Sequence, residues 1–335
     1  MVIISNSLKS IKATLEEKKP SKVVLISSGY LISKLDWAIT EVKELISSDI
    51  KVIQVPNGEE AKEWSVLRDL LNSFTESGLD RKGLVIALGG GSITDLVGFA
   101  SSIYLRGINY VNIPTTLLGQ VDSGIGGKTA INFGGYKNQV GSFYEPINII
   151  IDVRFLKTLD KSQIVDGLAE IIKAGLIKDP TILDILKSHS LIGLKEKPTI
   201  EELISKAVKV KEYFTSRDPR DSGIRQILNF GHTVAHALEL KYKLSHGQAV
   251  LIGMIEELKF GEKLGKTKPE VISHLNEIIR GLGISPETKG FIVDWGSILH
   301  DKKVLRDEIT MPIIKKIGEA ELINIKLDKL LSLVK

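Results

Sequence analysis

The sequence predicts an α/β N-terminal domain with a Rossmann-like, mostly parallel sheet, followed by an all-α C-terminal domain. Two observations lead to this fold class. In the first half, short β-branched apolar runs alternate with amphipathic stretches, which is typical of a parallel sheet covered by helices. After about residue 155 the strand signal fades and helical periodicity takes its place.

Five apolar runs in the first half predict buried parallel strands. Each is four to six residues long and rich in Val and Ile, as strands covered on both faces usually are. Residues 32–46 and 59–74 lie between these runs, and their apolar residues recur at spacings of three and four, which predicts helices. We therefore expect a doubly wound sheet. The predicted strands are 22–27, 50–55, 84–88, 110–113 and 147–152.

Helical periodicity dominates the second half, and no linker rich in Pro, Gly or Ser separates the halves. We place the boundary near residue 158, which gives domains 1–158 and 159–335. Ligands of open α/β sheets bind beyond the carboxyl ends of the strands, so we expect a ligand cleft between the halves. The predicted helices are 163–177, 200–214, 231–240, 248–264 and 269–282.

Composition limits the classes of function. With 43% hydrophobic and 26% charged residues, the 335-residue chain matches an ordinary globular protein, and without cysteine any metal must take nitrogen or oxygen ligands. No run of about eighteen apolar residues occurs, so we expect no membrane partner and cytoplasmic residence. The net charge of +4 is spread among glutamates, which favours a small anionic substrate over nucleic acid.

The segment Gly89-Gly-Gly-Ser92 joins a predicted strand to a predicted helix. Glycines there let backbone N–H groups approach a pyrophosphate at the start of the helix. The spacing differs from G-x-G-x-x-G, so an ordinary strand-to-helix turn is the alternative. The segment predicts a phosphate-binding turn for a dinucleotide.

A second glycine-rich segment, Ser123 to Thr129, resembles the end of a P-loop. That motif requires glycine where this chain has Asp122, which disfavours a nucleoside triphosphatase. Lys128 lies among the glycines, where it would bind a phosphate as a point charge or remain a solvated turn lysine.

Three histidines within fifteen residues predict a metal site. His232 and His236, at i and i+4, share a helix face, so spacing alone nominates both as ligands with His246 as the third. No Glu follows the first histidine, so the general base of zinc proteases is missing. Glu170 is a further candidate ligand because an unpaired charge on its apolar helix would be costly, although an ion pair with Lys173 is the alternative.

Taken in order, the motifs resemble the 3-dehydroquinate synthase family of sugar-phosphate cyclases, over most of the chain. The resemblance implies a lyase of the shikimate route to aromatic amino acids, which converts 3-deoxy-D-arabino-heptulosonate 7-phosphate to 3-dehydroquinate and phosphate. It implies transient oxidation by NAD, phosphate elimination, re-reduction and intramolecular aldol closure. The matching segments are 56–62, 89–95, 106–107, 114–118, 120–129, 136–138, 155–158, 167–173, 225–236, 245–247 and 301–303.

The same resemblance implies the ligand contacts. A divalent metal, usually zinc with cobalt as the alternative, would bind Glu170, His232 and His246. By this resemblance His236 is a substrate-contacting residue and not a metal ligand. The family also suggests a homodimer. NAD would contact Asn57, Glu59, Lys62, Gly90, Gly91, Ser92, Asp95, Thr115, Thr116, Asp122, Lys128, Lys137, Phe155 and Thr158. The anionic sugar-phosphate substrate and its reaction would involve Arg106, Asp122, Lys128, Asn138, Lys173, Lys211, Arg225, Asn229, His236 and one of Lys302 and Lys303.

Two departures from the family pattern affect these expectations. After the first long apolar run the chain reads Ser27-Ser-Gly-Tyr30, where the family usually has Asp and Asn, so NADP is an alternative to NAD. Before Arg225 the chain has Asp221 in place of a glutamate, which sets the carboxylate about one methylene further back.

Three other functions compete with this one. An NAD(P)-dependent metal alcohol dehydrogenase, such as a glycerol-1-phosphate dehydrogenase, would share the turn at 89–95, but Lys211, Arg225 and Asn229 suit a carboxylate, and 301–303 also argues against it. Another cyclase, making an inosose or valiolone, would usually differ at Asn229. A catalytically silent binding protein has no need of the complete set of metal ligands.

Overall fold

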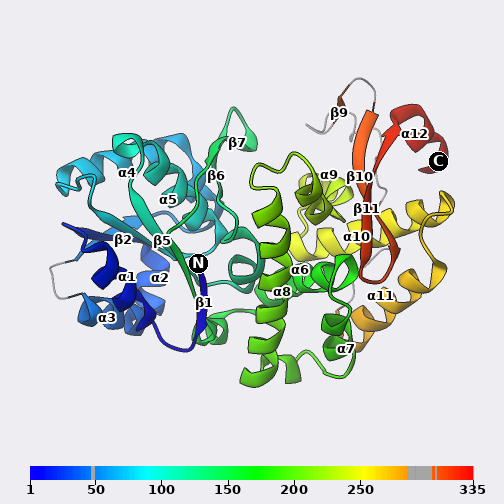
Figure 1. The fold of residues 1–335 in the computed structure, drawn as a ribbon, viewed down its shortest axis with the longest axis horizontal. Coiled ribbons are helices and arrows are strands. Elements are labelled where there is room, and N and C mark those ends of the chain that lie inside the picture. Colours follow the sequence, from blue (N-terminus) through cyan, green and yellow to red (C-terminus); the bar gives the residue numbers. More distant parts are fainter. Residues whose placement is uncertain (47–49, 285–290, 292–303, 306–307, 335) are drawn as a thin grey trace. The chain divides into compact units, whose positions relative to one another are not determined.

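The computed structural model describes residues 1–46, 50–284, 291, 304–305 and 308–334. The chain divides into two compact units, Met1–Leu159 and Asp160–Lys335 (Figure 1). None of the helices in the described ranges is long and apolar enough to cross a membrane.

The first unit contains a six-stranded sheet in the order β1-β8-β5-β4-β2-β3, with every neighbouring pair parallel. This confirms the predicted parallel sheet. The sequence analysis missed β1, whose four residues are only half-buried. The strands are β1 (Val2–Ser5), β2 (Val23–Ser28), β3 (Lys51–Val55), β4 (Leu84–Gly89), β5 (Asn109–Pro114) and β8 (Asn148–Asp152).

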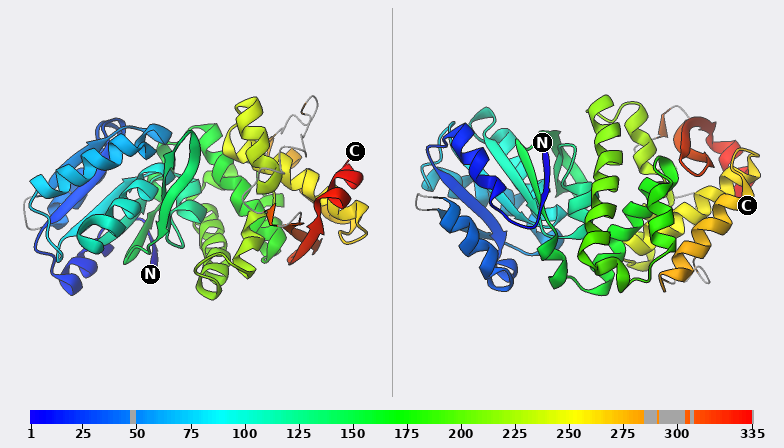
Figure 2. Two further views of the ribbon diagram at one scale, coloured as in Figure 1. Left: turned by 90° about the horizontal axis from the view of Figure 1, so that it is seen from above. Right: turned by 60° about the horizontal axis from the view of Figure 1, so that its bottom comes forward.

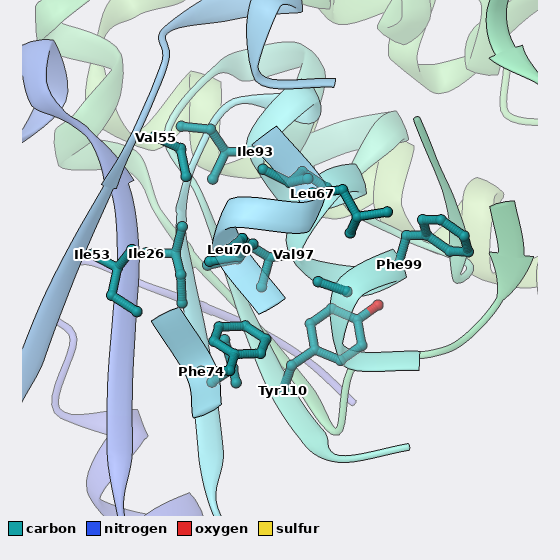
Figure 3. Close-up of a cluster of buried hydrophobic side chains, with 14 of the residues drawn as sticks. Ile26, Ile53, Val55, Leu67, Leu70, Phe74, Ile93, Val97, Phe99 and Tyr110 are labelled. Atoms are coloured by element: carbon teal, nitrogen blue, oxygen red, sulfur yellow. The ribbon is translucent and has the colours of Figure 1, made fainter. Parts of the chain in front are cut away.

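Helices cover both faces of this sheet (Figure 2). Side chains alternate between the faces along each strand, so Val24 and Ile26 of β2 join one core cluster while Val23 and Leu25 join the other. Figure 3 shows the first cluster, where Ile26 packs with residues of α4 and α5. The helices of this unit are α1 (Ser10–Lys18), α2 (Gly29–Lys34), α3 (Asp36–Leu45), α4 (Trp64–Glu76) and α5 (Gly91–Ile103).

Four short helical turns and one hairpin complete the first unit. The hairpin pairs β6 (Lys128–Phe133) with β7 (Tyr136–Phe143), and Gly134 and Gly135 between them both have positive φ, as a tight two-residue turn requires. The turns are η1 (Gly58–Lys62), η2 (Tyr104–Arg106), η3 (Gly119–Ser123) and η4 (Val153–Thr158).

The second unit is mainly helical, as predicted. Helix α10 packs against α6 and α9, and α6 is buried along almost its whole length. The elements are α6 (Lys161–Ile177), α7 (Thr181–Lys187), η5 (Gly193–Lys195), α8 (Lys197–Arg217), η6 (Ile224–Asn229), α9 (His232–Tyr242), α10 (His246–Lys263), α11 (Pro269–Gly281) and α12 (Leu327–Val334).

The prediction that this domain is all-α needs one correction, because it also contains a small antiparallel sheet in the order β11-β10-β9. The strands are β9 (Val304–Leu305), β10 (Glu308–Lys316) and β11 (Glu319–Lys326). Residues 311–314 of β10 are all buried, as in a strand covered on both faces, and Gly318 turns the chain with a φ of 80°. A short apolar run of this kind does not by itself distinguish a strand from a buried helix segment, and the sequence analysis did not find this strand.

Candidate active site

The structure brings Glu170, His232 and His246 together, and we call these three residues the metal centre. One candidate ligand atom from each residue lies within 4.8 Å of the other two. The Nε2 atoms of His246 and His232 lie 3.0 Å and 3.4 Å from the Oε1 atom of Glu170. The three side chains come from α6, α9 and α10, so tertiary packing of the second unit creates the cluster.

Each imidazole stands on the first residue of a helix. His232 begins α9 directly after Gly231, whose φ of 82° favours glycine. His246 begins α10, where Ser245 and Gln248 form a reciprocal capping box that fixes the start of the helix. Local sequence therefore determines the point at which each histidine leaves the backbone.

The second nitrogen of each ring has an acceptor of its own. Nδ1 of His246 lies 3.0 Å from Oε1 of Glu239, and Nδ1 of His232 lies 3.2 Å from the carbonyl oxygen of Phe230. Such acceptors orient an imidazole and leave Nε2 available to a metal. The sequence analysis missed Glu239, although it follows His232 by two helical turns and shares its helix face.

Charges around Glu170 keep it ionised. Its Oε2 atom forms an ion pair with Lys173, and both side chains are buried, so the predicted ion pair and the predicted ligand position coexist. Burial would raise the pKa of Glu170, but Lys173 and the two histidines hold it well below its usual range. Burial and the Lys173 charge lower the pKa of His232. Burial also acts to lower the pKa of His246, but Glu170 and Glu239 raise it to about 10.

This donor set fits a divalent metal. One carboxylate and two imidazoles, with no thiolate, match the three protein ligands of a catalytic zinc site, which keeps a further position for a substrate oxygen. The acceptors behind both imidazoles are also those expected around such a site.

His236, which spacing alone nominated as a ligand, is not part of the metal centre. Its side chain is exposed, and its ring centroid lies 5.9 Å from that of His232. The other two residues of the metal centre, Glu170 and His246, come from other helices. Their side chains meet that of His232, which lies one turn before His236 on α9. Packing between helices decides the ligand set, and a spacing within one helix does not reveal it.

Besides Lys173, two predicted substrate cations of the second unit are buried. Lys211 of α8 and Arg225 of η6 have exposed fractions of 8% and 1%. The Asp218 carboxylate accepts hydrogen bonds from three backbone N–H groups between residues 219 and 225. These bonds hold the backbone of the loop that leads to Arg225. Asn229 is half-buried at the end of η6. Lys302 and Lys303 lie outside the described residues.

In the first unit, the glycine turn lies against the segment after β5. A Cβ atom on Gly91 would lie 2.7 Å from the Ser123 hydroxyl, and one on Gly90 would lie 3.2 Å from the Thr116 methyl. The Thr115 N–H donates to the last carbonyl of β4 over 3.0 Å. A side chain on either glycine would crowd these neighbours, so the glycines favour the close approach. Four predicted cofactor residues, Gly90, Gly91, Thr115 and Thr116, are brought together at this turn.

The position of the turn in the sheet also suits a dinucleotide. From β2 the chain moves to the edge strand β3, then returns to β4 and continues through β5 to β8 in the opposite direction. The order of the strands therefore reverses between β2 and β4. Ligands of open α/β sheets bind at such a point, beyond the carboxyl ends of the strands.

A polar cluster adjoins the start of α5. The Nζ atom of Lys62, which is 3% exposed, lies 2.5 Å from Oδ2 of Asp95 and also donates to the Asn138 side chain. Burial raises the pKa of Asp95 to about 6 against the opposing charge of Lys62, and Glu59 and Asp122 add to the rise. We call Lys62, Asp95 and Asn138 the lysine cluster.

Neighbouring polar side chains support the lysine cluster. Glu59 accepts hydrogen bonds from Asn132 over 2.9 Å and from the Ser92 hydroxyl over 3.3 Å. The backbone N–H of Asn138 donates to the Asn132 side chain over 3.0 Å. Nearer to β2, Asn57 accepts a hydrogen bond from Ser28 over 3.1 Å.

The remaining predicted residues of the first unit differ in exposure. Arg106, Lys128 and Lys137 are exposed, and Asp122 is half-buried in η3. The Phe155 side chain is fully buried and stacks on Trp37, so any contact of Phe155 with a cofactor would come from its backbone. Thr158 donates its hydroxyl to the Phe155 carbonyl over 2.7 Å.

Comparisons with known proteins decide the family. The model of the 3-dehydroquinate synthase N-terminal domain matches residues 52–166, and that of the C-terminal domain matches residues 167–304. The chain belongs to the 3-dehydroquinate synthase family. A 3-dehydroquinate synthase of Sulfurisphaera tokodaii is 39% identical over 332 residues, which span 96% of this chain and 92% of that protein. The family that the motifs suggested is thereby confirmed.

Solved structures of related cyclases share the fold. The 2-epi-5-epi-valiolone synthase of Streptomyces hygroscopicus subsp. jinggangensis, solved with NAD+ and Zn2+ bound, is 26% identical with a TM-score of 0.86, and the match covers 100% of this chain and 95% of that chain. A 2-deoxy-scyllo-inosose synthase, complexed with carbaglucose-6-phosphate, NAD+ and Co2+, has a TM-score of 0.87 at 22% identity, covering 99% and 95%. These matches confirm the predicted fold class.

Proposed function

We propose that this chain converts 3-deoxy-D-arabino-heptulosonate 7-phosphate to 3-dehydroquinate and phosphate. The convergence of Glu170, His232 and His246, in a chain whose family is established, is the observation that carries this proposal. The buried cations Lys173, Lys211 and Arg225 of the same unit suit a substrate that bears both a phosphate and a carboxylate.

The metal centre would hold a divalent cation, zinc or cobalt. When bound, the metal supplies a Lewis acid that lowers the pKa of a coordinated hydroxyl group. Lys173 keeps Glu170 ionised before the metal arrives, and Glu239 holds the His246 ring so that Nε2 points toward Glu170. These residues therefore prepare a cation site with little rearrangement.

The first unit would hold NAD at the turn between β4 and α5. The first N–H groups of α5 lie outside the hydrogen-bond ladder of the helix, which makes them donors for a pyrophosphate. When bound, NAD supplies a hydride acceptor that is regenerated within each turnover. The wider contact set remains a proposal: Asn57, Glu59, Lys62, Gly90, Gly91, Ser92, Asp95, Thr115, Thr116, Asp122, Lys128, Lys137, Phe155 and Thr158.

The buried cations would hold the acidic groups of the substrate. Ion pairs made in a dry environment are stronger than those made in water, so Lys211 and Arg225 would bind a carboxylate or phosphate firmly. The same cations would stabilise the charge on phosphate as it leaves. Arg106, Lys128, Asn138, Asn229 and His236 are proposed as further substrate contacts, and Asp122 as a further reaction residue.

The decisive experiment follows phosphate release. The protein is incubated with the heptulosonate phosphate, zinc and NAD at about one twentieth of the substrate concentration. We expect phosphate to exceed NAD many-fold, with no accumulation of NADH, and no release after treatment with a chelator. Stoichiometric NADH without phosphate release would contradict the proposal and favour the alcohol dehydrogenase.

A second candidate is a cyclase that acts on a sugar phosphate without a carboxylate. The structural match to the valiolone synthase favours it, since it covers the whole chain. Buried Arg225 argues for a carboxylate in the substrate. Comparing the heptulosonate phosphate with sugar phosphates that lack this group distinguishes the two, and we expect turnover only of the heptulosonate.

Cofactor choice and assembly also remain proposals. Ser27 and Ser28 end β2 and donate hydrogen bonds to the Leu88 carbonyl and the Asn57 side chain. The stretch 27–30 contains no carboxylate that would repel the 2′-phosphate of NADP. The activities with NAD and with NADP therefore need to be compared. We expect a homodimer, which light scattering tests, and cytoplasmic residence also stays a prediction.

A further inference from the structure

The start of α9 is held by a buried carboxylate of another helix. Glu257 of α10 is 1% exposed. Its Oε2 atom accepts a hydrogen bond from the Gly231 N–H over 2.8 Å, and its Oε1 atom accepts one from the Thr233 N–H over 3.1 Å. These two residues flank His232 on either side. Glu257 therefore fixes the backbone from which the first imidazole of the metal centre projects.

The packing around this contact leaves little room for adjustment. A Cβ atom on Gly253 of α10 would clash with the carbonyl oxygen of Gly231, and a Cβ atom on Gly231 would lie 2.7 Å from the Met254 side chain. Gly253 and Glu257 are one helical turn apart, so they present one face of α10 to the start of α9. The two helices touch backbone to backbone beside His232.

The second imidazole has an equivalent support from α6. Asp166 accepts a hydrogen bond from the Gly247 N–H over 2.7 Å, and Gly247 directly follows His246. A Cβ atom on Gly247 would lie 2.5 Å from the Cα atom of Asp166, so this contact is also a close backbone approach. Asp166 precedes Glu170 by one turn of α6, which places the support and the carboxylate ligand on one helix face.

We propose that Glu257 and Asp166 are positioning residues of the metal centre. Glu257 accepts two N–H groups at the start of α9, and Asp166 accepts one at the start of α10, where the helix itself offers no acceptor. Each thereby fixes the backbone beside one ligand histidine. The three ligand atoms then converge before a metal binds. This inference rests on the proposed function, because it takes Glu170, His232 and His246 as the ligands.

A purely structural role would have different consequences. If Glu257 only stabilised the fold, its replacement would lower the stability of the protein but leave the affinity and geometry of a bound metal unchanged. If it positions His232, the affinity for zinc and the geometry at the metal must both change. Residues in the outer shell of metal sites typically change metal affinity by about 10- to 100-fold.

Glu257→Gln in the full chain tests this directly. Glutamine keeps the shape of the side chain but turns one acceptor into an NH2 donor that faces a backbone N–H. We expect zinc affinity, measured by competition with a chromophoric chelator, to fall about 10- to 100-fold, and the visible absorption spectrum of bound Co2+ to change. The control is Glu256→Gln, since this neighbouring residue pairs with Lys259 over 2.7 Å on the exposed surface.

The outcomes separate this inference from the proposed function. If the parent protein binds no zinc, the proposed function fails first. If the parent binds zinc and Glu257→Gln matches Glu256→Gln in both affinity and Co2+ spectrum, the positioning role is wrong. For Asp166→Asn, at a half-buried position, we expect the same fall in zinc affinity and the same change in the Co2+ spectrum. This variant tests the positioning role if Glu257→Gln does not fold.

Discussion

The metal centre and the lysine cluster are each built around a carboxylate paired with a buried lysine, yet the two carboxylates behave in opposite ways. Lys173 and two histidines surround Glu170, and they hold its pKa well below its usual range. Asp95 pairs with Lys62 and has Glu59 and Asp122 nearby, and burial raises its pKa to about 6. In both sites burial raises the carboxyl pKa and a buried lysine lowers it. At Glu170 the lysine and two histidines together outweigh burial, and at Asp95 they are replaced by Lys62 with two nearby acids, so burial prevails.

This difference separates two kinds of site. A carboxylate that stays ionised while buried suits a divalent cation, which is the role proposed for Glu170. A carboxylate that titrates near neutrality, within a network of hydrogen bonds, suits a neutral or partly charged ligand group, which agrees with the NAD contact proposed for Asp95. The following predictions test whether the two clusters act separately.

The largest effect is expected at the metal centre. His246→Ala removes one of three ligands, so we expect loss of bound zinc, measured by metal analysis, and loss of activity. Zinc affinity should fall by more than the roughly 100-fold upper range of outer-shell substitutions, and turnover should fall below detection. His189→Ala, at a half-buried histidine that contacts the Ile185 carbonyl, is the control and should retain the zinc content and activity of the parent. Equal zinc content in His246→Ala would show that the ligands lie elsewhere.

A smaller but selective effect is expected from the first unit. Lys128→Ala should reduce turnover by about 10²- to 10⁴-fold while zinc stays bound, because Lys128 is proposed to contact NAD and the substrate and not the metal. Steady-state kinetics and metal analysis on one preparation test both parts. Lys82→Ala, at an exposed lysine in a turn before β4, is the control. Loss of zinc from Lys128→Ala would show that the metal centre depends on a residue of the first unit, and would contradict separate roles for the two units.

The smallest effect concerns stability and pH. An Asp carboxyl titrates near 3.9 in an unfolded chain, and the pKa of Asp95 in the folded protein is about 6. Asp95 therefore stabilises the fold fully below about pH 4, and this contribution is lost as the pH rises through about 6. Between about pH 4 and pH 7, the parent should lose up to about 3 kcal/mol of unfolding free energy relative to Asp95→Asn.

Denaturant unfolding at a series of pH values measures this difference. Asp69→Asn, at an exposed residue of α4 that pairs with Arg68, is the control and should show no such trend. A constant difference between the parent and Asp95→Asn over this range would mean that Asp95 is ionised throughout, like Glu170. The contrast between the two clusters would then be lost.

Much of the fold and part of the site could be predicted from the sequence. Periodicity found the buried strands and the longer helices because each buries one face or both. The cost of an unpaired buried charge pointed to Glu170, and the same reasoning applied to Glu257 would have found a second buried carboxylate. The contacts of Glu257 and Asp166 could not be predicted, because they join residues of different helices whose packing no local pattern encodes.

The central claim is that Glu170, His232 and His246 bind one divalent metal. X-ray diffraction from zinc-loaded crystals, recorded at the zinc absorption edge, tests it most directly. We predict one anomalous peak at about 2.0–2.2 Å from Oε1 of Glu170 and from Nε2 of both histidines. A peak bound by other side chains, or no peak from fully zinc-loaded protein, would contradict the account.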